Sequence, residues 1–401
     1  MLWLAAKKLG SGAERLREIV DASFVTVAEW PKEVLASLST MTESSSSLPI
    51  TLESIGGWPE LISQLLDRRD IDAAYARAAM ANILAGSATP AQLIGFVVAL
   101  RAKGETPEEI SGLLDAVLAA ATLVPLDESL RDQAIDIVGT GGDRSHSINV
   151  STMAAIVVAG AGVPVCKHGA RAASSQCGTA DVLEALGVVV ELSPQGVLRC
   201  IERAGIGFCL AARYHPAFRF AAPARREIGV PTVFNLLGPM ANPGRVKRQL
   251  IGVANPLVAE KMLASLRLHG ATSSWVVHGG GLDELTTTGP STVLELRDGH
   301  VRTFTVDPVA LGLAPAISTE LTGGTPAFNA DVVRRVMDGE HGAHRNIVVL
   351  NAAAGLVVAD VADSLEEGIA IAETAIDSGK AFQALSLLVS ESQSALVDFG
   401  A

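Results

Sequence analysis

Between residues 135 and 210 the sequence alternates short runs of β-branched residues with longer helical segments, and this alternation constrains the fold more than any other feature. The patterns predict strands over 135–138, 163–167, 188–192 and 206–210, separated by helices over 149–161 and 179–186 and by a helix that Ser193-Pro194 opens. Strand, helix and strand repeated in this way is typical of an α/β domain with right-handed crossovers. Hydrophobic residues make up 49% of the 401 residues but aromatic residues only 4%, so the core must be built from small aliphatic side chains.

The segments on either side have their own patterns. Residues 52–124 are helical, with Leu93, Phe96, Val97 and Leu100 on one helix face and Thr-Pro pairs at 89–90 and 106–107 as helix starts. After residue 210 we expect further strands at 274–278, 292–296 and 347–350, and a last long helix over 364–378 that opens with a capping box. The sequence therefore predicts a small helical domain (49–126) followed by a large α/β domain (127–401).

Residues 1–48 differ from the rest of the chain. They carry mixed charges and end in the serine run 44–47, which has the composition of a flexible linker. Met41 lies just before that run. We expect either that translation starts at or near Met41 or that this segment is a loosely held, dispensable extension.

Composition excludes several classes of protein. The chain has 31 basic and 43 acidic residues, a net charge of −12, which disfavours general binding to a nucleic-acid backbone. Its apolar runs are shorter than the roughly 18–20 residues of a membrane span, and its first residues reverse the order of a secretory signal. The four cysteines lack C-x-x-C spacing, which favours buried thiols in a reducing compartment. We expect a cytoplasmic protein.

Two loops that follow predicted strands carry anion-binding chemistry. The first loop, Gly139–Asp143, precedes a helix that begins with Asn149-Val150-Ser151-Thr152, and its glycines let backbone N–H groups approach an anion. The second loop, Lys167–Ser175, adds two cations and two hydroxyls before Gly178-Thr179 opens another helix. Each loop has a purely structural alternative, a βα turn or a solvated surface, but two such loops at neighbouring strand ends suit a ligand with two phosphate groups.

Two further elements could complete a site. The acidic pair, Asp283-Glu284, follows three glycines and could hold one or two hard cations such as Mg²⁺. Arg225-Arg226, in a helical stretch over 215–228, could clamp a substrate carboxylate. The alternatives are an acidic dipeptide without a role and an ordinary pair on a helix surface.

Taken in order, these motifs resemble anthranilate phosphoribosyltransferases. The resemblance covers about residues 50–395 and rests on six ordered motifs: the first loop, residues 149–152, 167–169 with 174–175, 180–187, 235–239 and 283–285. It implies the fold of type III nucleoside phosphorylases, in which a small helical domain, joined by helices from about 214–245, is hinged to a large α/β domain. It also implies transfer of a phosphoribosyl group from phosphoribosyl pyrophosphate to anthranilate in tryptophan biosynthesis, and a homodimer formed through the helical domain.

The resemblance also implies roles for individual residues. Ser151, Asp283 and Glu284 would hold Mg²⁺, with two ions expected, while Gly139, Ala170 and Arg225 would contact anthranilate. Phosphoribosyl pyrophosphate would be held by residues of the two loops and of the helix starts behind them: Gly139, Gly142, Asp143, Ser147, Asn149, Val150, Ser151, Thr152, Lys167, His168, Gly169, Ala170, Arg171, Ala172, Ala173, Ser174, Ser175 and Thr179.

The expected chemistry needs no acid or base. Breaking the anomeric C–O bond leaves negative charge on pyrophosphate, which Mg²⁺ and fixed N–H donors stabilise, and an aromatic amine is already a competent nucleophile. We therefore assign no catalytic base and interpret His168 and His215 as packing residues.

One position departs from the family pattern. Ala170 stands where the family has an asparagine that contacts anthranilate, and losing one such hydrogen bond costs ~1–3 kcal/mol. The enzyme could tolerate the loss, accept another aromatic amine, or carry a deliberate substitution. Two other functions are weaker alternatives. A pyrimidine nucleoside phosphorylase is disfavoured by the acidic pair and by residues 235–239, and a non-catalytic nucleic-acid-binding paralogue is disfavoured by the net charge.

Overall fold

The computed structural model describes residues 50–172 and 176–400. The predicted N-terminal extension lies outside the described residues, and so do Ala173, Ser174 and Ser175 of the second loop.

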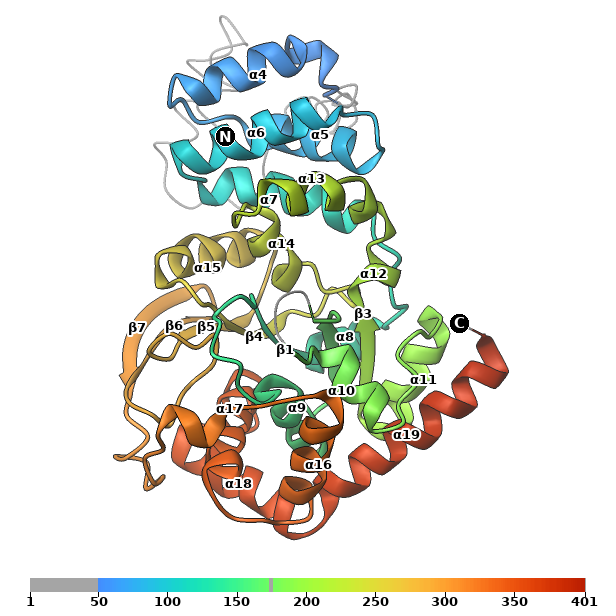
Figure 1. Ribbon diagram of the computed structural model, residues 1–401, viewed down its shortest axis with the longest axis vertical. Helices are drawn as coiled ribbons and strands as arrows, with labels where there is room; N and C mark the ends of the chain where they lie inside the picture. Colours follow the sequence, from blue (N-terminus) through green and yellow to red (C-terminus); the bar gives the residue numbers. More distant parts are fainter. Residues whose placement is uncertain (1–49, 173–175, 401) are drawn as a thin grey trace, which may run out of the picture. The chain divides into compact units, whose positions relative to one another are not determined.

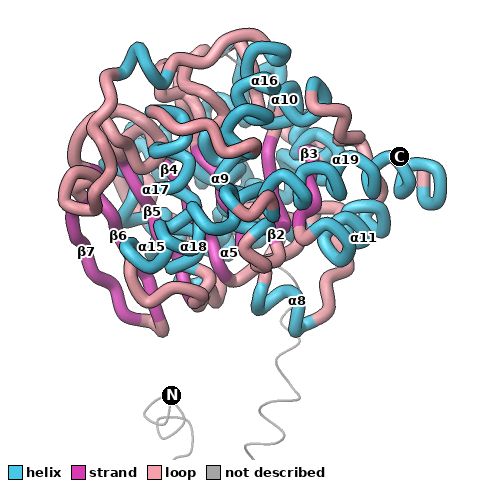
Figure 2. The backbone as a smooth tube through the Cα atoms, turned by 90° about the horizontal axis from the view of Figure 1, so that it is seen from below, coloured by secondary structure: helices cyan, strands magenta, loops and turns pink. Residues whose placement is uncertain are grey.

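A seven-stranded sheet forms the centre of the large α/β region (Figures 1 and 2). Its strands in spatial order are β3 (Ile206–Leu210), β2 (Val165–Gly169), β1 (Ile135–Gly139), β4 (Arg248–Gly252), β5 (Ser273–His278), β6 (Ser291–Arg297) and β7 (His300–Val306). The strands from β3 to β5 run parallel, and β6 and β7 add an antiparallel edge. The chain winds outward from β1 to β3 and then returns to the other side of β1, so the strand order reverses between β1 and β4. Ligands of open α/β sheets bind at such a point, at the carboxyl ends of the strands.

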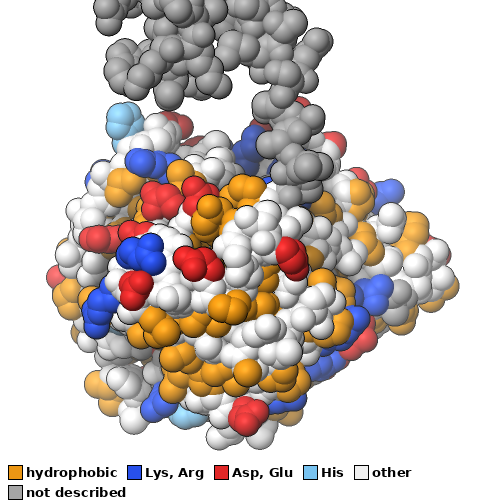
Figure 3. Space-filling model, turned by 90° about the horizontal axis from the view of Figure 1, so that it is seen from above, with side chains coloured by type: hydrophobic (Ala, Val, Ile, Leu, Met, Phe, Trp, Pro, Cys, Tyr) orange, Lys and Arg blue, Asp and Glu red, His pale blue; other side chains and the backbone are white. Residues whose placement is uncertain are grey.

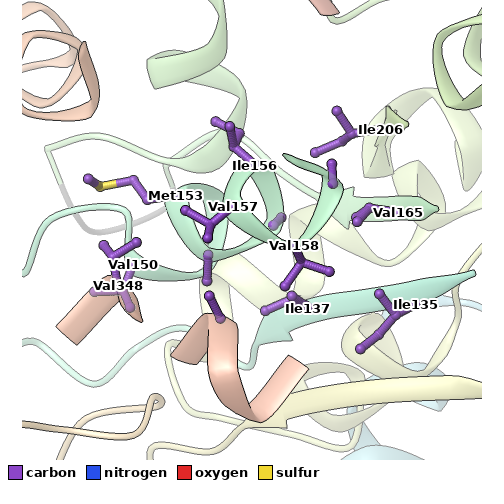
Figure 4. Packing of buried hydrophobic residues seen from close by; sticks show 14 of the residues in the cluster. Ile135, Ile137, Val150, Met153, Ile156, Val157, Val158, Val165, Ile206 and Val348 are labelled. Carbon is purple, nitrogen blue, oxygen red and sulfur yellow. The ribbon is translucent and has the colours of Figure 1, made fainter. Parts of the chain in front are cut away.

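Helices pack on this sheet around a core of small aliphatic side chains. Ile135 and Ile137 of β1 belong to one cluster with Val157 and Val158 of α9 and Val348 of α17, in which Val158 lies beside Ile137 (Figure 4). The helices of this region are α8 (Glu128–Gln133), α9 (Val150–Gly160), α10 (Thr179–Ala185), α11 (Pro194–Ala204), α12 (Ala211–Tyr214), α16 (Pro326–Met337), α17 (Ala343–Val358), α18 (Leu365–Asp377) and α19 (Lys380–Phe399).

A second core belongs to the helical region. It joins α4 (Gly57–Leu66), α5 (Ala73–Leu84), α6 (Pro90–Lys103) and α7 (Pro107–Ala119) to the later helices α13 (Ala222–Ile228), α14 (Phe234–Met240) and α15 (Ala259–Leu268). Ile251 of β4 and Val276 of β5 belong to this core too, so it reaches the sheet. The described residues also form short 3₁₀ turns: η3 (Glu53–Ile55), η4 (Pro216–Phe220), η5 (Pro256–Val258) and η6 (Ser318–Leu321).

The predicted fold class is confirmed, and so are both predicted threonine caps. The Thr89 hydroxyl accepts from Gln92 N while the Gln92 side chain accepts from Thr89 N, and Thr106 and Glu109 repeat this capping box. All four cysteines are buried. No helix in the described parts of the chain has the length and hydropathy to cross a membrane.

Several predicted elements were wrong. Residues 347–350 lie in α17, which is buried on nearly every side, and periodicity cannot separate such a helix from a buried strand. Residues 188–192 form no strand: Val189 N donates instead to the Ser392 hydroxyl at 3.0 Å, and Leu192 O accepts from Arg213 and Tyr214. The helix predicted over 364–378 is present as α18, but it is not the last one, because α19 follows it. Strands β4 and β7 were not predicted.

Candidate active site

Two glycines at the switch point let the acidic pair pack directly on the sheet. Gly139, at the end of β1, is paired with Gly252, at the end of β4. A Cβ on Gly139 would lie 2.2 Å from Asp283 Oδ2, and one on Gly252 would lie 1.5 Å from the Asp283 carbonyl oxygen. The structure thus brings together the first loop and the acidic pair, as the sequence analysis expected.

The acidic pair contacts backbone N–H groups of the phosphate-binding elements. Asp283 Oδ2 accepts from Gly141 N at 2.7 Å, and Glu284 Oε1 accepts from Ser151 N at 3.2 Å, in the first turn of α9. Burial and then the nearby negative charge of Asp143 raise the pKa of Asp283 to about 7. Burial and the charge of Asp283 likewise raise the pKa of Glu284. A bound cation would relieve the repulsion among these three converging carboxylates.

Lys167 lies under this cluster, at the third position of β2. Its side chain is almost fully buried, and Nζ donates to the Ile137 carbonyl oxygen at 2.5 Å and to the Ser151 hydroxyl at 3.3 Å. Burial lowers the pKa of Lys167, while the charges of Asp136 and Glu284 oppose that shift. The structure therefore places this cation in the floor of the site, beside Ser151.

The starts of α9 and α10 lie next to each other. The Thr152 and Thr179 hydroxyl oxygens are 3.5 Å apart, and the Val150 side chain is buried in the core, so only its backbone can serve a ligand. Just after the first loop, the Ser145 hydroxyl donates to Asp143 at 2.6 Å, and its oxygen lies 3.2 Å from the Ser147 hydroxyl oxygen. Gly142 has a positive φ of 79°, which favours glycine there.

The described part of the second loop turns away from the strand end. Gly169 ends β2, Ala170 is exposed, and Ala172 N donates to Asp181 Oδ2 at 2.9 Å. The exposed Arg171 guanidinium pairs with Glu184 at 2.5 Å, so in this structure its charge is engaged on the surface.

Arg225 is joined to the second loop by a row of rings. Its guanidinium carbon lies 4.9 Å from the centre of the Phe234 ring, and burial lowers the pKa of this arginine. From Phe234 the row continues through Phe218 and His215 to His168, with centre-to-centre distances between 5.1 and 5.7 Å. His168, His215 and Phe234 are buried and only Phe218 is partly exposed, so the row is packing beside Arg225.

The two histidines of this row are packing residues. Both are buried, and His215 Nε2–H donates to the Ala241 carbonyl oxygen at 2.8 Å. Burial lowers the pKa of His215 to about 4, and burial together with His215 holds the pKa of His168 well below its usual range.

Replacing His215 by glutamine should reduce the pH dependence of stability. The folded state disfavours protonated His215, so below about pH 6.5 the unfolded chain binds more protons than the folded protein. The free energy of unfolding therefore decreases as the pH is lowered. From about pH 7.5 to 5.5, His215 lowers the free energy of unfolding of the wild type by about 1.3 kcal/mol, and the variant lacks this loss. Urea unfolding at both pH values measures it, with the exposed His300→Gln as control. An unchanged pH dependence in His215→Gln would contradict this account.

Sequence reasoning missed three supporting residues, Asp136, Asn242 and Asn329. Buried Asp136 accepts from His168 N at 3.1 Å and from Asn242 Nδ2 at 2.8 Å, so it fixes the start of the second loop. The Asn329 amide donates to Asn149 Oδ1 at 2.8 Å and accepts from Gly324 N at 2.8 Å. Asp136 could have been identified, because it is a charged residue inside an apolar predicted strand. Nothing in the sequence near Asn329 indicated its contact with Asn149.

Comparison with known proteins gives consistent results. Residues 131–382 match the model of a glycosyl transferase family a/b domain, and residues 59–121 match the helical bundle domain of a glycosyl transferase family. Anthranilate phosphoribosyltransferase from Salinispora arenicola is 49% identical over 334 residues, covering 82% of this chain and 94% of the relative. The enzyme of that name from Thermomicrobium roseum is 51% identical over 323 residues, covering 80% and 92%.

Solved structures agree with these matches. The anthranilate phosphoribosyltransferase of Thermus thermophilus aligns with a TM-score of 0.78 and 39% identity, covering 83% of this chain and 99% of that one. The Saccharomyces cerevisiae enzyme in complex with PRPP and Mg aligns with a TM-score of 0.76 and 28% identity, covering 84% and 98%.

Proposed function

The chain belongs to the anthranilate phosphoribosyltransferase family, and we propose that it transfers the phosphoribosyl group of 5-phosphoribosyl 1-pyrophosphate (PRPP) to the amine of anthranilate. The products are N-(5-phosphoribosyl)anthranilate and pyrophosphate, in tryptophan biosynthesis. One observation carries the proposal: the first loop and the acidic pair are packed together at the switch point of the sheet. The alternative acceptor amine and the nucleic-acid-binding paralogue find no support among the relatives.

We assign the PRPP site to the two loops and the helix starts behind them. Gly141 N and Ser151 N donate to Asp283 and Glu284, so the first loop and the start of α9 are held against the acidic pair. The starts of α9 and α10 add partial positive charge for phosphate oxygens. The assigned residues are those named in the sequence analysis, of which 173–175 lie outside the described part of the chain.

The acidic pair and Ser151 fit a magnesium site. Hard oxygen ligands suit Mg²⁺, and the raised pKa of Asp283 reflects burial and a repulsion from Asp143 that a cation would remove. Glu284 contacts Ser151 N, so the three proposed ligands are neighbours. When bound, Mg²⁺ supplies positive charge that stabilises the departing pyrophosphate. We propose two ions, since a diphosphate and three carboxylates offer enough oxygen ligands.

The chain's own groups act by position and charge. Backbone donors of the first loop hold the diphosphate, and the buried Lys167 offsets the negative charge of Glu284. Arg225 faces the acceptor carboxylate, and the contact of its guanidinium with the buried Phe234 ring holds it in place, which orients the aromatic amine toward the sugar. No acid or base is assigned, in keeping with the burial and low pKa of both histidines.

We further propose a cytoplasmic homodimer that pairs through the helical region, with domain boundaries at 49–126 and 127–401. The helical region exposes large apolar side chains, including Leu66, Val98 and Phe220. The view onto that end of the molecule shows apolar side chains lying between charged ones (Figure 3).

The loss of anthranilate fluorescence with PRPP and Mg²⁺ tests this function. We expect turnover by the wild type and a KM for anthranilate about tenfold lower in Ala170→Asn, because asparagine restores one hydrogen bond. Ala170 is exposed, so the variant should fold normally. Absence of turnover in both folded proteins would refute the proposed function, and an unchanged KM would refute the explanation of Ala170.

A further inference from the structure

A cavity of about 380 Å³ lies beside the amino ends of strands β4 and β5, whereas the active site lies at the carboxyl ends of the strands. Its walls include Lys247 and Gln249 at the start of β4, Ala271 just before β5, and Arg131 in the helix that precedes β1. The exposed Arg77 of α5 lines the cavity from the helical region. The volume of the cavity is in the range of sites that bind small molecules.

Positive charge gathers in this cavity, although the chain as a whole carries a net charge of −12. Arg77, Arg131, Arg245 and Lys247 line it, against the single carboxylate of Asp115. Lys247 pairs with Asp132 at 2.9 Å, which leaves an excess of two positive charges. A concave wall with charges of one sign concentrates ions of the opposite sign.

Two of the arginines have unused hydrogen-bond donors. Arg131 Nη2 donates to the Leu126 carbonyl oxygen at 3.0 Å, but its Nε is buried without a partner among the described residues. Arg77 makes no ion pair or side-chain hydrogen bond with any residue that the structure describes. A buried N–H without a partner is unfavourable, and an anion would satisfy it.

Apolar side chains such as Leu114, Leu118 and Met240 also line the cavity. A lining with both cationic and apolar side chains matches a molecule with one anionic group on an apolar body. We propose that this cavity binds a small organic anion, a carboxylate or a phosphate monoester with an aromatic or aliphatic body.

Such a ligand would touch both regions of the protein. It would bridge Arg77 of α5 and the apolar Leu114 of α7 to Arg131 and the segment 242–247. Asn242 lines the cavity and donates to Asp136, which accepts from His168 N in β2. Two hydrogen bonds therefore connect this cavity to the start of the second loop.

Arginine side-chain NMR tests the proposal on the full chain without metal. Benzoate, phenyl phosphate and inorganic phosphate are titrated in turn while the ¹⁵N signal of Arg131 Nε–H is followed, assigned by its loss in Arg131→Lys. This signal separates the cavity from any binding near Arg225. We expect a saturable shift with benzoate or phenyl phosphate at roughly millimolar concentration, and the stronger of the two identifies the anionic group.

Variants decide whether the charges of the cavity cause the binding. Arg77→Gln should weaken it about tenfold without harming the fold, because Arg77 has no polar contact to lose among the residues described, and Arg245→Gln should act similarly. Arg267→Gln, an exposed arginine outside the cavity, is the matched control and should leave the affinity unchanged. The proposal is overturned if Arg131 does not respond by roughly 10 mM, if only inorganic phosphate shifts it, or if Arg77→Gln and the control behave alike.

Discussion

Replacing Asp283 by asparagine is expected to lower kcat/KM for PRPP by about 10²- to 10³-fold. Asparagine can still accept the hydrogen bond from Gly141 N, so the loop should keep its place on the sheet. What is lost is one negative charge at the proposed magnesium site, together with affinity for the metal. Initial rates over a range of Mg²⁺ concentrations measure both effects.

The same variant should gain stability when metal is removed. Burial and the charge of Asp143 make the ionised Asp283 unfavourable in the folded protein. A carboxyl whose folded pKa is raised to about 7 destabilises the fold increasingly as pH rises from 3.8 through 7, so asparagine should stabilise the metal-free protein above pH 7. Asp338→Asn, at an exposed position without an ion pair among the described residues, is the control. Wild-type rates and Mg²⁺ dependence in Asp283→Asn would refute the metal site.

The sequence predicted the chemistry of the site because each part is local. Glycine-rich turns, helix starts and the acidic pair are each contained within a few neighbouring residues. Their contact was harder to predict, since Gly141 and Asp283 are 142 residues apart. Only the resemblance to the family placed them in one site. Asn329 was missed for the same reason, because its contact with Asn149 spans 180 residues.

The errors in the predicted elements have a physical cause. Residues 347–350 lie within a helix surrounded by other side chains, so both of its faces are apolar and the helical period is hidden. Strand β4 was missed because it begins with Arg248 and Gln249, whose side chains reach backbone carbonyl groups at 2.9 Å and 3.2 Å. These partners compensate for polar residues that the pattern alone would assign to a loop.

Gly252 shows what the missed strand does for the site. An alanine there would place its Cβ 1.5 Å from the Asp283 carbonyl oxygen and 2.3 Å from its carbonyl carbon. Both atoms are backbone, so no side-chain rotation relieves the clash. Because β4 is paired on both sides, by β1 and β5, the strand cannot move without breaking the sheet. The loop that carries the acidic pair must therefore move instead.

We expect Gly252→Ala to lower the free energy of unfolding by about 2–4 kcal/mol and kcat/KM by at least about 100-fold. Urea unfolding gives the first quantity, and rates measured where the variant is fully folded give the second. Gly289→Ala is the matched control, because nothing lies within 4 Å of a Cβ at that position. A folded Gly252→Ala with normal rates and normal Mg²⁺ affinity would mean that close packing of this loop on β4 is not what positions the carboxylates, since a displaced loop could not keep Asp283 within reach of Gly141 N.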